Sequence, residues 1–220
     1  MIKKRDIKYI GRLIEFEGVD ACGKTTCINK LKEYLESINK KVIVYDFPQY
    51  NTYIGQIIST YLRGEYGDIN DIPQNIINIL FASDRVSIQS ELKEYLDKGY
   101  YVLLNRYTYS NIFQIARSNG NIEDLENLEF NILNILKPDD VVYITLPIEI
   151  IEKRINSREK REYQKGKEDI YESNKKLLID TDEFYKKVAK DRKWHIINGY
   201  DKEELDIECI VNLIKKELNL

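Results

Sequence analysis

The sequence predicts an α/β fold in which a five-stranded parallel sheet carries helices on both faces. Apolar runs of strand length alternate along the chain with longer segments of helical periodicity, as in successive strand–helix–strand units. One run, residues 101–104, is almost entirely apolar, which is typical of a strand in the middle of a parallel sheet. A glycine-rich loop joins the first apolar run to the first helical segment, so strand, loop and helix follow in the order that such a sheet requires.

The expected elements follow the same alternation to the end of the chain. Strands are expected at residues 12–17, 42–45, 101–104, 140–146 and 194–197, each a short apolar run. Helices are expected at residues 26–38, 54–62, 74–98, 110–117, 122–136, 147–157 and 203–218, with one more before the last strand. Pro73 suits the first turn of the third helix, and Gly99 suits its end. No repeat, low-complexity tract or linker divides the pattern, so residues 1–220 are expected to form a single domain.

Composition excludes several classes of partner. The chain has 43% hydrophobic and 32% charged residues, and its net charge of −3 is too small to indicate a nucleic acid or a membrane surface. No apolar run approaches the length of a membrane span, and residues 1–6 lack the apolar core of a signal peptide. The three cysteines are odd in number and lack metal-ligand spacing, so we expect reduced thiols in a cytoplasmic protein.

The loop at residues 18–25 reads Gly-Val-Asp-Ala-Cys-Gly-Lys-Thr and fits the pattern G-x-x-x-x-G-K-[ST]. Backbone N–H groups converge there at a helix N-terminus, and the helix dipole adds partial positive charge, so a di- or triphosphate binds. Lys24 is expected to reach the β- and γ-phosphates, and Thr25 to hold Mg²⁺. The residues expected to bind the nucleoside triphosphate are Gly18, Val19, Asp20, Ala21, Cys22, Gly23, Lys24, Thr25 and Thr26.

Other features select among the protein classes that share this loop. A GTPase needs an Asn-Lys-x-Asp guanine reader on a late strand, and the sequence has none. A motor or transporter ATPase usually carries an apolar strand that ends in an acidic pair, whereas residues 101–104 are followed by Asn105-Arg106-Tyr107. An arginine at the edge of a strand beside the phosphate loop is placed to bind a second phosphate group. Arg106 therefore favours phosphoryl transfer onto an acceptor that already carries a phosphate.

Taken together, these motifs resemble the thymidylate kinases, a family of nucleoside monophosphate kinases, and the match is collinear over essentially the whole chain. The resemblance implies the P-loop kinase fold with a short lid at about residues 154–169. It also implies ATP-dependent phosphorylation of dTMP to dTDP for dTTP biosynthesis, with Mg²⁺ as cofactor. Members of the family often form homodimers through helices on one face.

The resemblance assigns roles along the acceptor site. Asp20 would lie near the sugar hydroxyl and the metal, and Arg106 would hold the acceptor phosphate. The Phe81 ring would stack on thymine while Arg85 bonds its carbonyl, and residues four apart on one helix face are able to grip a flat base together. The remaining implied contacts are Phe47 and Pro48 in the pocket wall, Ser110 and Asn111 near the base and sugar, and Tyr171 and Glu172 at the nucleoside.

The chain departs from the family pattern at two places. Asn105 replaces the usual aspartate near Mg²⁺, so we expect weaker metal affinity, with Thr25 and Glu17 as the other candidate metal residues. The segment after Asn111 is one residue shorter than usual. Either Phe113 or Gln114 therefore occupies the aromatic position near the sugar.

The charged stretch at 154–169 is where the family has its lid. Its cations require a counterion, and closure over ATP supplies one. Some family members carry an arginine at the position of Ala21, and its absence here suggests that the lid delivers the catalytic arginine. The candidates are Arg158 first, and then Arg154 and Arg161.

Two alternatives stay open at this stage. One is a kinase for another pyrimidine monophosphate or for a nucleoside. A nucleoside acceptor needs a general base for its hydroxyl, and Glu17 would serve as that base. The other is a nucleotide-binding protein that has lost catalysis, for which Asn105 is the only hint.

Overall fold

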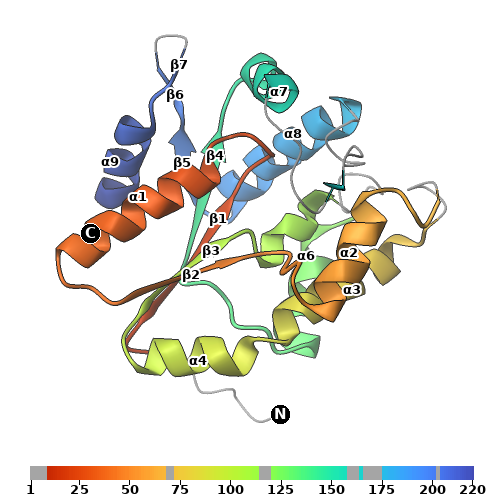
Figure 1. Ribbon diagram of the computed structural model, residues 1–220, viewed down its shortest axis with the longest axis horizontal. Coiled ribbons are helices and arrows are strands. Elements are labelled where there is room, and N and C mark those ends of the chain that lie inside the picture. The colour runs from red at the N-terminus through yellow and green to blue at the C-terminus, as the bar shows by residue number, and fades with distance from the viewer. Residues whose placement is uncertain (1–8, 68–71, 114–119, 158–163, 166–174, 202–203) are drawn as a thin grey trace.

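The computed structural model describes residues 9–67, 72–113, 120–157, 164–165, 175–201 and 204–220. Within them, a sheet of five parallel strands has the order β2-β3-β1-β4-β5 (Figure 1). The strands are β1 (Arg12–Glu17), β2 (Val42–Asp46), β3 (Tyr101–Asn105), β4 (Asp140–Thr145) and β5 (His195–Asn198). The structure confirms the predicted parallel α/β fold, and each predicted strand lies within one or two residues of its expected bounds.

Helices cover both faces of the sheet (Figure 1). They are α1 (Lys24–Ser37), α2 (Tyr53–Leu62), α3 (Gln74–Val86), α4 (Gln89–Asp97), α6 (Ile122–Glu126), α7 (Ile148–Ser157), α8 (Lys175–Asp191) and α9 (Ile207–Glu217). A 3₁₀ helix, η1 (Thr108–Asn111), follows β3, and a π-helix, η2 (Asn127–Ile132), continues α6. The short strands β6 (Tyr200–Asp201) and β7 (Glu204–Leu205) pair in an antiparallel hairpin before α9.

Side chains of β1 alternate between two environments because successive strand residues point to opposite faces. Ile14 and Phe16 pack in a cluster with the buried leucines of α1 and the apolar side of α9. Leu13 packs on the opposite face with residues of α4 and β3. Glu15 and Glu17 share that second face and are fully buried, so the strand carries two carboxylates into the interior.

The predicted helix at 74–98 is wrong in one respect, because the chain forms two helices, α3 and α4, in its place. Polar side chains next to the break satisfy carbonyl oxygens at the end of α3. The Ser87 hydroxyl donates to the Asp84 carbonyl over 2.6 Å, and the Gln89 amide donates to the Arg85 carbonyl over 2.8 Å. These bonds replace the intrahelical bonds that a continuous helix would make.

Three other predicted helices differ from the structure. The helix expected at 110–117 is replaced at its start by η1, and residues 114–119 lie outside the described residues. The helix expected at 122–136 changes from α to π at residue 127 and ends at residue 132. The helix expected at 203–218 begins only at Ile207, because the β6–β7 hairpin precedes it and Asp206 caps it by accepting from the Cys209 N–H. No helix in the described part of the chain is both long and apolar enough to span a membrane.

Candidate active site

A cavity of about 600 Å³ opens at the carboxyl-terminal ends of β1, β2 and β3. Parallel sheets characteristically place ligand sites at this edge. Of the predicted site residues, those that line it are Asp20, Ala21, Gly23, Lys24, Thr25, Thr26, Phe47, Pro48, Phe81, Arg85, Asn105, Arg106, Ser110, Asn111, Phe113 and Arg154. The fold therefore gathers residues from five separate segments around one space.

The glycine-rich loop lies at one end of the cavity in a conformation suited to an anion. Gly18 and Gly23 have φ angles of 145° and 97°, and a Cβ at Gly18 would come within 2.4 Å of a backbone oxygen. Gly23, at the N-terminus of α1, has no side chain to cap the helix, and the first turn of α1 has no acidic residue. The N–H groups at the start of α1 are therefore left for an anion. The Lys24 ammonium donates to the carbonyls of Gly18 and Val19 over 2.8 and 3.0 Å. Burial lowers the pKa of Lys24 most, and the positive charge of Arg106 lowers it further.

Arg106 faces the loop from the end of β3. Its Nη2 lies 3.1 Å from the Asp20 carboxylate, and its Nη1 lies 3.8 Å from Glu17. The Phe113 ring centroid is 5.4 Å from its guanidinium carbon. Burial alone would lower the pKa of Arg106, but the carboxylates of Asp20 and Glu17 raise it well above its usual value. The arginine therefore presents a permanent positive charge to the cavity.

The two buried carboxylates of β1 hold the segment that follows Arg106. Glu17 accepts hydrogen bonds from the Tyr107 N–H over 3.1 Å and from the hydroxyls of Ser110 and Tyr185 over 2.7 Å each. These donors occupy the oxygens of Glu17, and Glu17 does not line the cavity, while its expected role at the metal stays a prediction.

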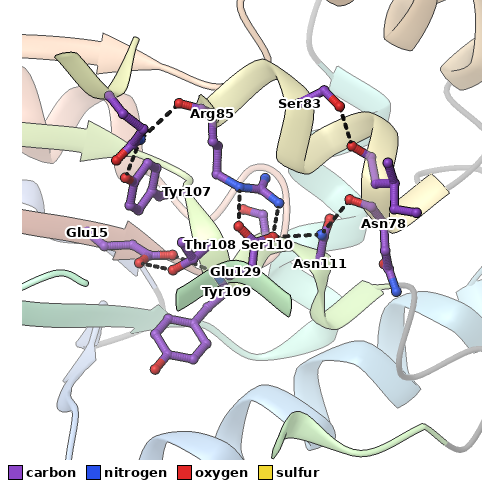
Figure 2. A network of polar contacts seen from close by, with 12 residues as sticks. Glu15, Asn78, Ser83, Arg85, Tyr107, Thr108, Tyr109, Ser110, Asn111 and Glu129 are labelled. Atoms are coloured by element: carbon purple, nitrogen blue, oxygen red, sulfur yellow. Dashed lines mark hydrogen bonds and ion pairs between the residues drawn. The ribbon is translucent and has the colours of Figure 1, made fainter. Parts of the chain in front are cut away.

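Glu15 was missed by the sequence analysis. It accepts from the Thr108 hydroxyl over 2.8 Å and from the Tyr109 N–H over 2.7 Å (Figure 2). The pKa of Glu15 is raised well above its usual value, mainly by burial and further by the neighbouring charge of Glu17. The available signal was an acidic residue within an apolar strand, two positions before Glu17 and so on the same face.

Arg85 and Asn111 meet at the other end of the cavity. Figure 2 shows the Arg85 side chain extending from α3 toward Glu129 of η2, with Asn111 beside them. Glu129 forms a fully buried ion pair with Arg85 through Nε and Nη2. Its Oε1 also accepts from the Asn111 amide over 3.1 Å. Glu129 was likewise missed, because nothing in the sequence marks the π-helix that places it there.

Aromatic side chains form the walls between these two ends. The Phe81 ring meets Tyr61 edge-on with centroids 6.3 Å apart, and Phe47 packs at a tilt on Tyr107 with centroids 5.5 Å apart. Of the two residues proposed for the aromatic position near the sugar, Phe113 lines the cavity. Gln114, Tyr171 and Glu172 lie outside the described residues, so their predicted contacts stay predictions.

Oxygen atoms suited to a hard cation gather beside the loop. The Asn105 amide donates to Thr25 Oγ1 over 3.1 Å and to Asp46 Oδ1 over 2.6 Å, which leaves its own Oδ1 buried without a hydrogen-bond partner in the described part of the chain. Such an orphaned oxygen fits Mg²⁺, which prefers oxygen ligands and keeps much of its water. Among the described residues, no cluster of three or more His, Cys, Asp or Glu side chains is arranged around a metal site.

One of the arginines predicted for the lid lies against the loop. Arg154, in the last turn of α7, donates from Nε to the Ala21 carbonyl over 2.7 Å and lines the cavity. Arg158 and Arg161 lie outside the described residues, so their order of preference stays a prediction.

Comparison with known proteins points to one family. Residues 16–212 match the family model described as thymidylate kinase. The thymidylate kinase of Plasmodium falciparum (isolate 3D7) is 35% identical over 214 residues, which cover 97% of this chain and 92% of that protein. That of Arabidopsis thaliana is 29% identical over 198 residues, covering 90% and 68%. A solved structure of the Candida albicans thymidylate kinase has a TM-score of 0.72 at 22% identity, covers 95% of this chain and 91% of that chain, and shares the fold.

The buried Glu15 predicts a specific pH dependence of stability. Because its folded pKa is raised above the unfolded value, the folded state holds a proton that the unfolded state has lost once the pH exceeds about 4.5. Stability contributed by the protonated group is therefore lost as the pH rises through the folded pKa, at up to about 1.4 kcal/mol per pH unit. In Glu15→Gln the amide stays neutral, so this loss should be absent.

The measurement is the free energy of unfolding by urea between pH 5 and 9. Glu33→Gln, at an exposed position on α1, is the control for loss of a charge. We expect the control to follow the wild-type curve while Glu15→Gln rises above it with increasing pH. Parallel curves for wild type and Glu15→Gln would contradict this account of Glu15.

Proposed function

The chain belongs to the thymidylate kinase family, so its reaction is the ATP-dependent phosphorylation of dTMP to dTDP, and we propose that the cavity holds both nucleotides of that reaction. The observation that carries this proposal is the opposition of two phosphate-binding groups across one space. The anion-ready loop with Lys24 lies on one side, and the charged Arg106 lies on the other, with Asp20 between them. Two phosphate chains are able to approach end to end there.

The donor end is formed by the loop and α7. ATP phosphates would take the N–H groups at the start of α1, and Lys24 would exchange its carbonyl partners for phosphate oxygens. Thr25 and Thr26 line the same end. Arg154 already reaches the loop, so we assign it as a lid arginine that adds positive charge during transfer.

The acceptor end is formed by α3 and the segment after β3. Arg106 would bind the dTMP phosphate, with Asp20 and Phe113 holding its guanidinium in place. The Phe81 ring is placed to stack on the base, while Arg85 and Asn111 are placed to meet the base edge. A phosphate oxygen is already a nucleophile, so this acceptor needs no general base.

A nucleoside acceptor fits the site poorly. It would need a base at its hydroxyl, and Glu17 was the candidate for that role. The Glu17 carboxylate is fully buried and is occupied by three hydrogen-bond donors. We therefore assign Glu17 to positioning the acceptor segment rather than to proton transfer or metal binding.

We propose that Thr25 and Asn105 hold Mg²⁺ through their side-chain oxygens, with the Asp46 carboxylate beside them, once the Asn105 amide turns so that its oxygen takes the place of the nitrogen that now faces Thr25 and Asp46. The orphaned Asn105 oxygen and the neighbouring carboxylate support this proposal. When bound, the ion offsets the negative charge of the phosphates. Around it, the protein positions donor and acceptor, supplies positive charge through Lys24 and Arg106, and excludes water.

Two further proposals concern the whole molecule. Large apolar side chains are exposed on neighbouring helices, namely Tyr53 and Ile57 of α2 and Ile76 and Ile79 of α3. Because a second copy would remove this apolar surface from water, their exposure supports a homodimer. Sedimentation velocity tests this proposal directly. A monomer at assay concentration would contradict it.

The three cysteines, all in the described part of the chain, form no disulfide, which supports a cytoplasmic location.

A coupled ADP-release assay over a panel of acceptors tests the function and the role of Arg106. With Mg²⁺ and ATP, we expect turnover of dTMP and little turnover of thymidine, because the nucleoside lacks the phosphate that Arg106 binds. Arg106→Met should lower kcat/KM for dTMP by about 10³-fold, since a charge-assisted bidentate contact is lost. Arg63→Met, which removes an arginine outside the cavity, is the matched control. Turnover of thymidine in preference to dTMP would contradict the assignment.

The metal proposal predicts an unusual response of Asn105→Asp. Without Mg²⁺, the new carboxylate faces Asp46 across the present 2.6 Å contact, so we expect a loss of roughly 1–3 kcal/mol of stability. Mg²⁺ should restore that loss, and it should stabilise the variant more than the wild type. Thermal unfolding with Mg²⁺ or with EDTA measures both effects. Equal stabilisation of the two proteins by Mg²⁺ would show that Asn105 is not at the metal.

A further inference from the structure

We infer that Glu129 is a positioning residue that sets the base specificity of the site. It holds the Arg85 guanidinium and the Asn111 amide in fixed orientations. The cavity therefore presents a hydrogen-bond donor and a hydrogen-bond acceptor, side by side, to the edge of the base. The inference rests on the proposed function, because it takes the base of the acceptor nucleotide to lie between these two residues. It adds to that function the group that selects among bases.

Glu129 enters the site from an unusual piece of backbone. It lies in the π-helix η2, and π-helical segments are rare and occur frequently at functional sites. Its side chain is fully buried and contacts residues 44 and 18 positions earlier in the chain. A buried carboxylate is retained only when it is paired and hydrogen-bonded, and here Arg85 and Asn111 supply both.

The contact with Arg85 determines which of its N–H groups remain for a ligand. Glu129 takes the side of the guanidinium that carries Nε and Nη2. Arg85 lines the cavity, so the N–H groups of Nη1 are left to donate into it. The Glu129 carboxylate also raises the pKa of Arg85 against the lowering effect of burial, which keeps this donor charged.

The contact with Asn111 determines which atom of its amide faces the ligand. Asn111 Nδ2 donates to Glu129 Oε1 over 3.1 Å and to the Asn78 backbone carbonyl over 3.3 Å (Figure 2). Both partners are acceptors only. A flipped amide would place Oδ1 against two other oxygens, so the amide has one stable orientation. Oδ1 is therefore left as the acceptor at the cavity, which Asn111 lines.

A hydrogen-bond donor next to a hydrogen-bond acceptor is complementary to a base edge that has the opposite order of groups. Thymine offers the O4 carbonyl, which accepts from Arg85, and the N3–H, which donates to the Asn111 oxygen. Cytosine offers an amino group and an unprotonated N3, so both interactions are reversed. A site built from buried polar groups rejects a ligand that leaves them unpaired far more strongly than it rejects a small change of shape.

Two nucleotide substrates that differ only in the order of hydrogen-bond donor and acceptor on the base test this prediction. 5-Methyl-dCMP has the shape and methyl group of dTMP but reverses the donor and acceptor at positions 3 and 4. For the wild type, we expect kcat/KM for dTMP to exceed that for 5-methyl-dCMP by at least about 10³-fold. In Glu129→Gln, an amide replaces the carboxylate and is able to offer either a donor or an acceptor to Asn111. The ratio should then fall at least tenfold, mainly because KM for dTMP rises while kcat changes less.

Glu126→Gln is the matched control. Glu126 lies three residues earlier in the chain, and its partly exposed carboxylate pairs with Arg192 and accepts from the Tyr109 hydroxyl away from the cavity, so this change weakens an ion pair near η2 without touching the base site. It should keep the wild-type ratio. If Glu129→Gln fails to fold, Glu129→Asp keeps the charge against Arg85, and its shorter side chain cannot span both partners, so the same fall is expected.

The outcomes separate this inference from the proposed function. A wild type that does not turn over dTMP would overturn the proposed function and this inference with it. A wild type that discriminates as expected, with a ratio unchanged in the Glu129 variant, would overturn the role of Glu129 alone. An equal fall in Glu126→Gln would show a general loss of structure and would also overturn it.

Discussion

The contact between β1 and the segment after β3 is the interaction on which the site depends. Glu17 is the last residue of β1 and directly precedes the phosphate loop, and its carboxylate holds Tyr107 and Ser110 next to Arg106. One residue thus joins the proposed donor end of the cavity to the proposed acceptor end. Because the two ends share this anchor, the separation between the loop and Arg106 is set by the fold and not by the ligands.

The anchor places several charges in a small buried volume, and each is compensated locally. Glu17 accepts hydrogen bonds from backbone and hydroxyl donors, which offset the cost of removing its carboxylate from water, while Glu15 beside it avoids a second charge by holding a proton. Arg106 balances Asp20, and Arg85 balances Glu129 at the opposite end. The site is therefore preorganised: its charged side chains are already oriented by the protein, so little reorganisation is required when phosphates enter.

The sequence predicted the sheet and the position of the glycine-rich loop well because their signals are local. Apolar strand runs and the glycine pattern depend on neighbouring residues, and the structure places Lys24 and Arg106 on one cavity as expected. Glu15 and Glu129 were missed because their roles come from partners far away in the chain. The break after Val86 was missed because it depends on side-chain hydrogen bonds from Ser87 and Gln89 to carbonyls of α3, which helical periodicity does not register. Glu17 was recognised as important, but its hydrogen bonds to Tyr107, Ser110 and Tyr185 were not foreseen because they also come from distant segments.

The central claim is that one cavity binds both nucleotides, with their phosphates end to end. The most direct measurement is calorimetric binding of a dinucleotide in which adenosine and deoxythymidine are joined 5′ to 5′ by five phosphates. The account predicts one ligand per chain, an affinity well above that of ATP or dTMP alone, and competition with both nucleotides. Two ligands per chain, or competition with only one of the nucleotides, would contradict it.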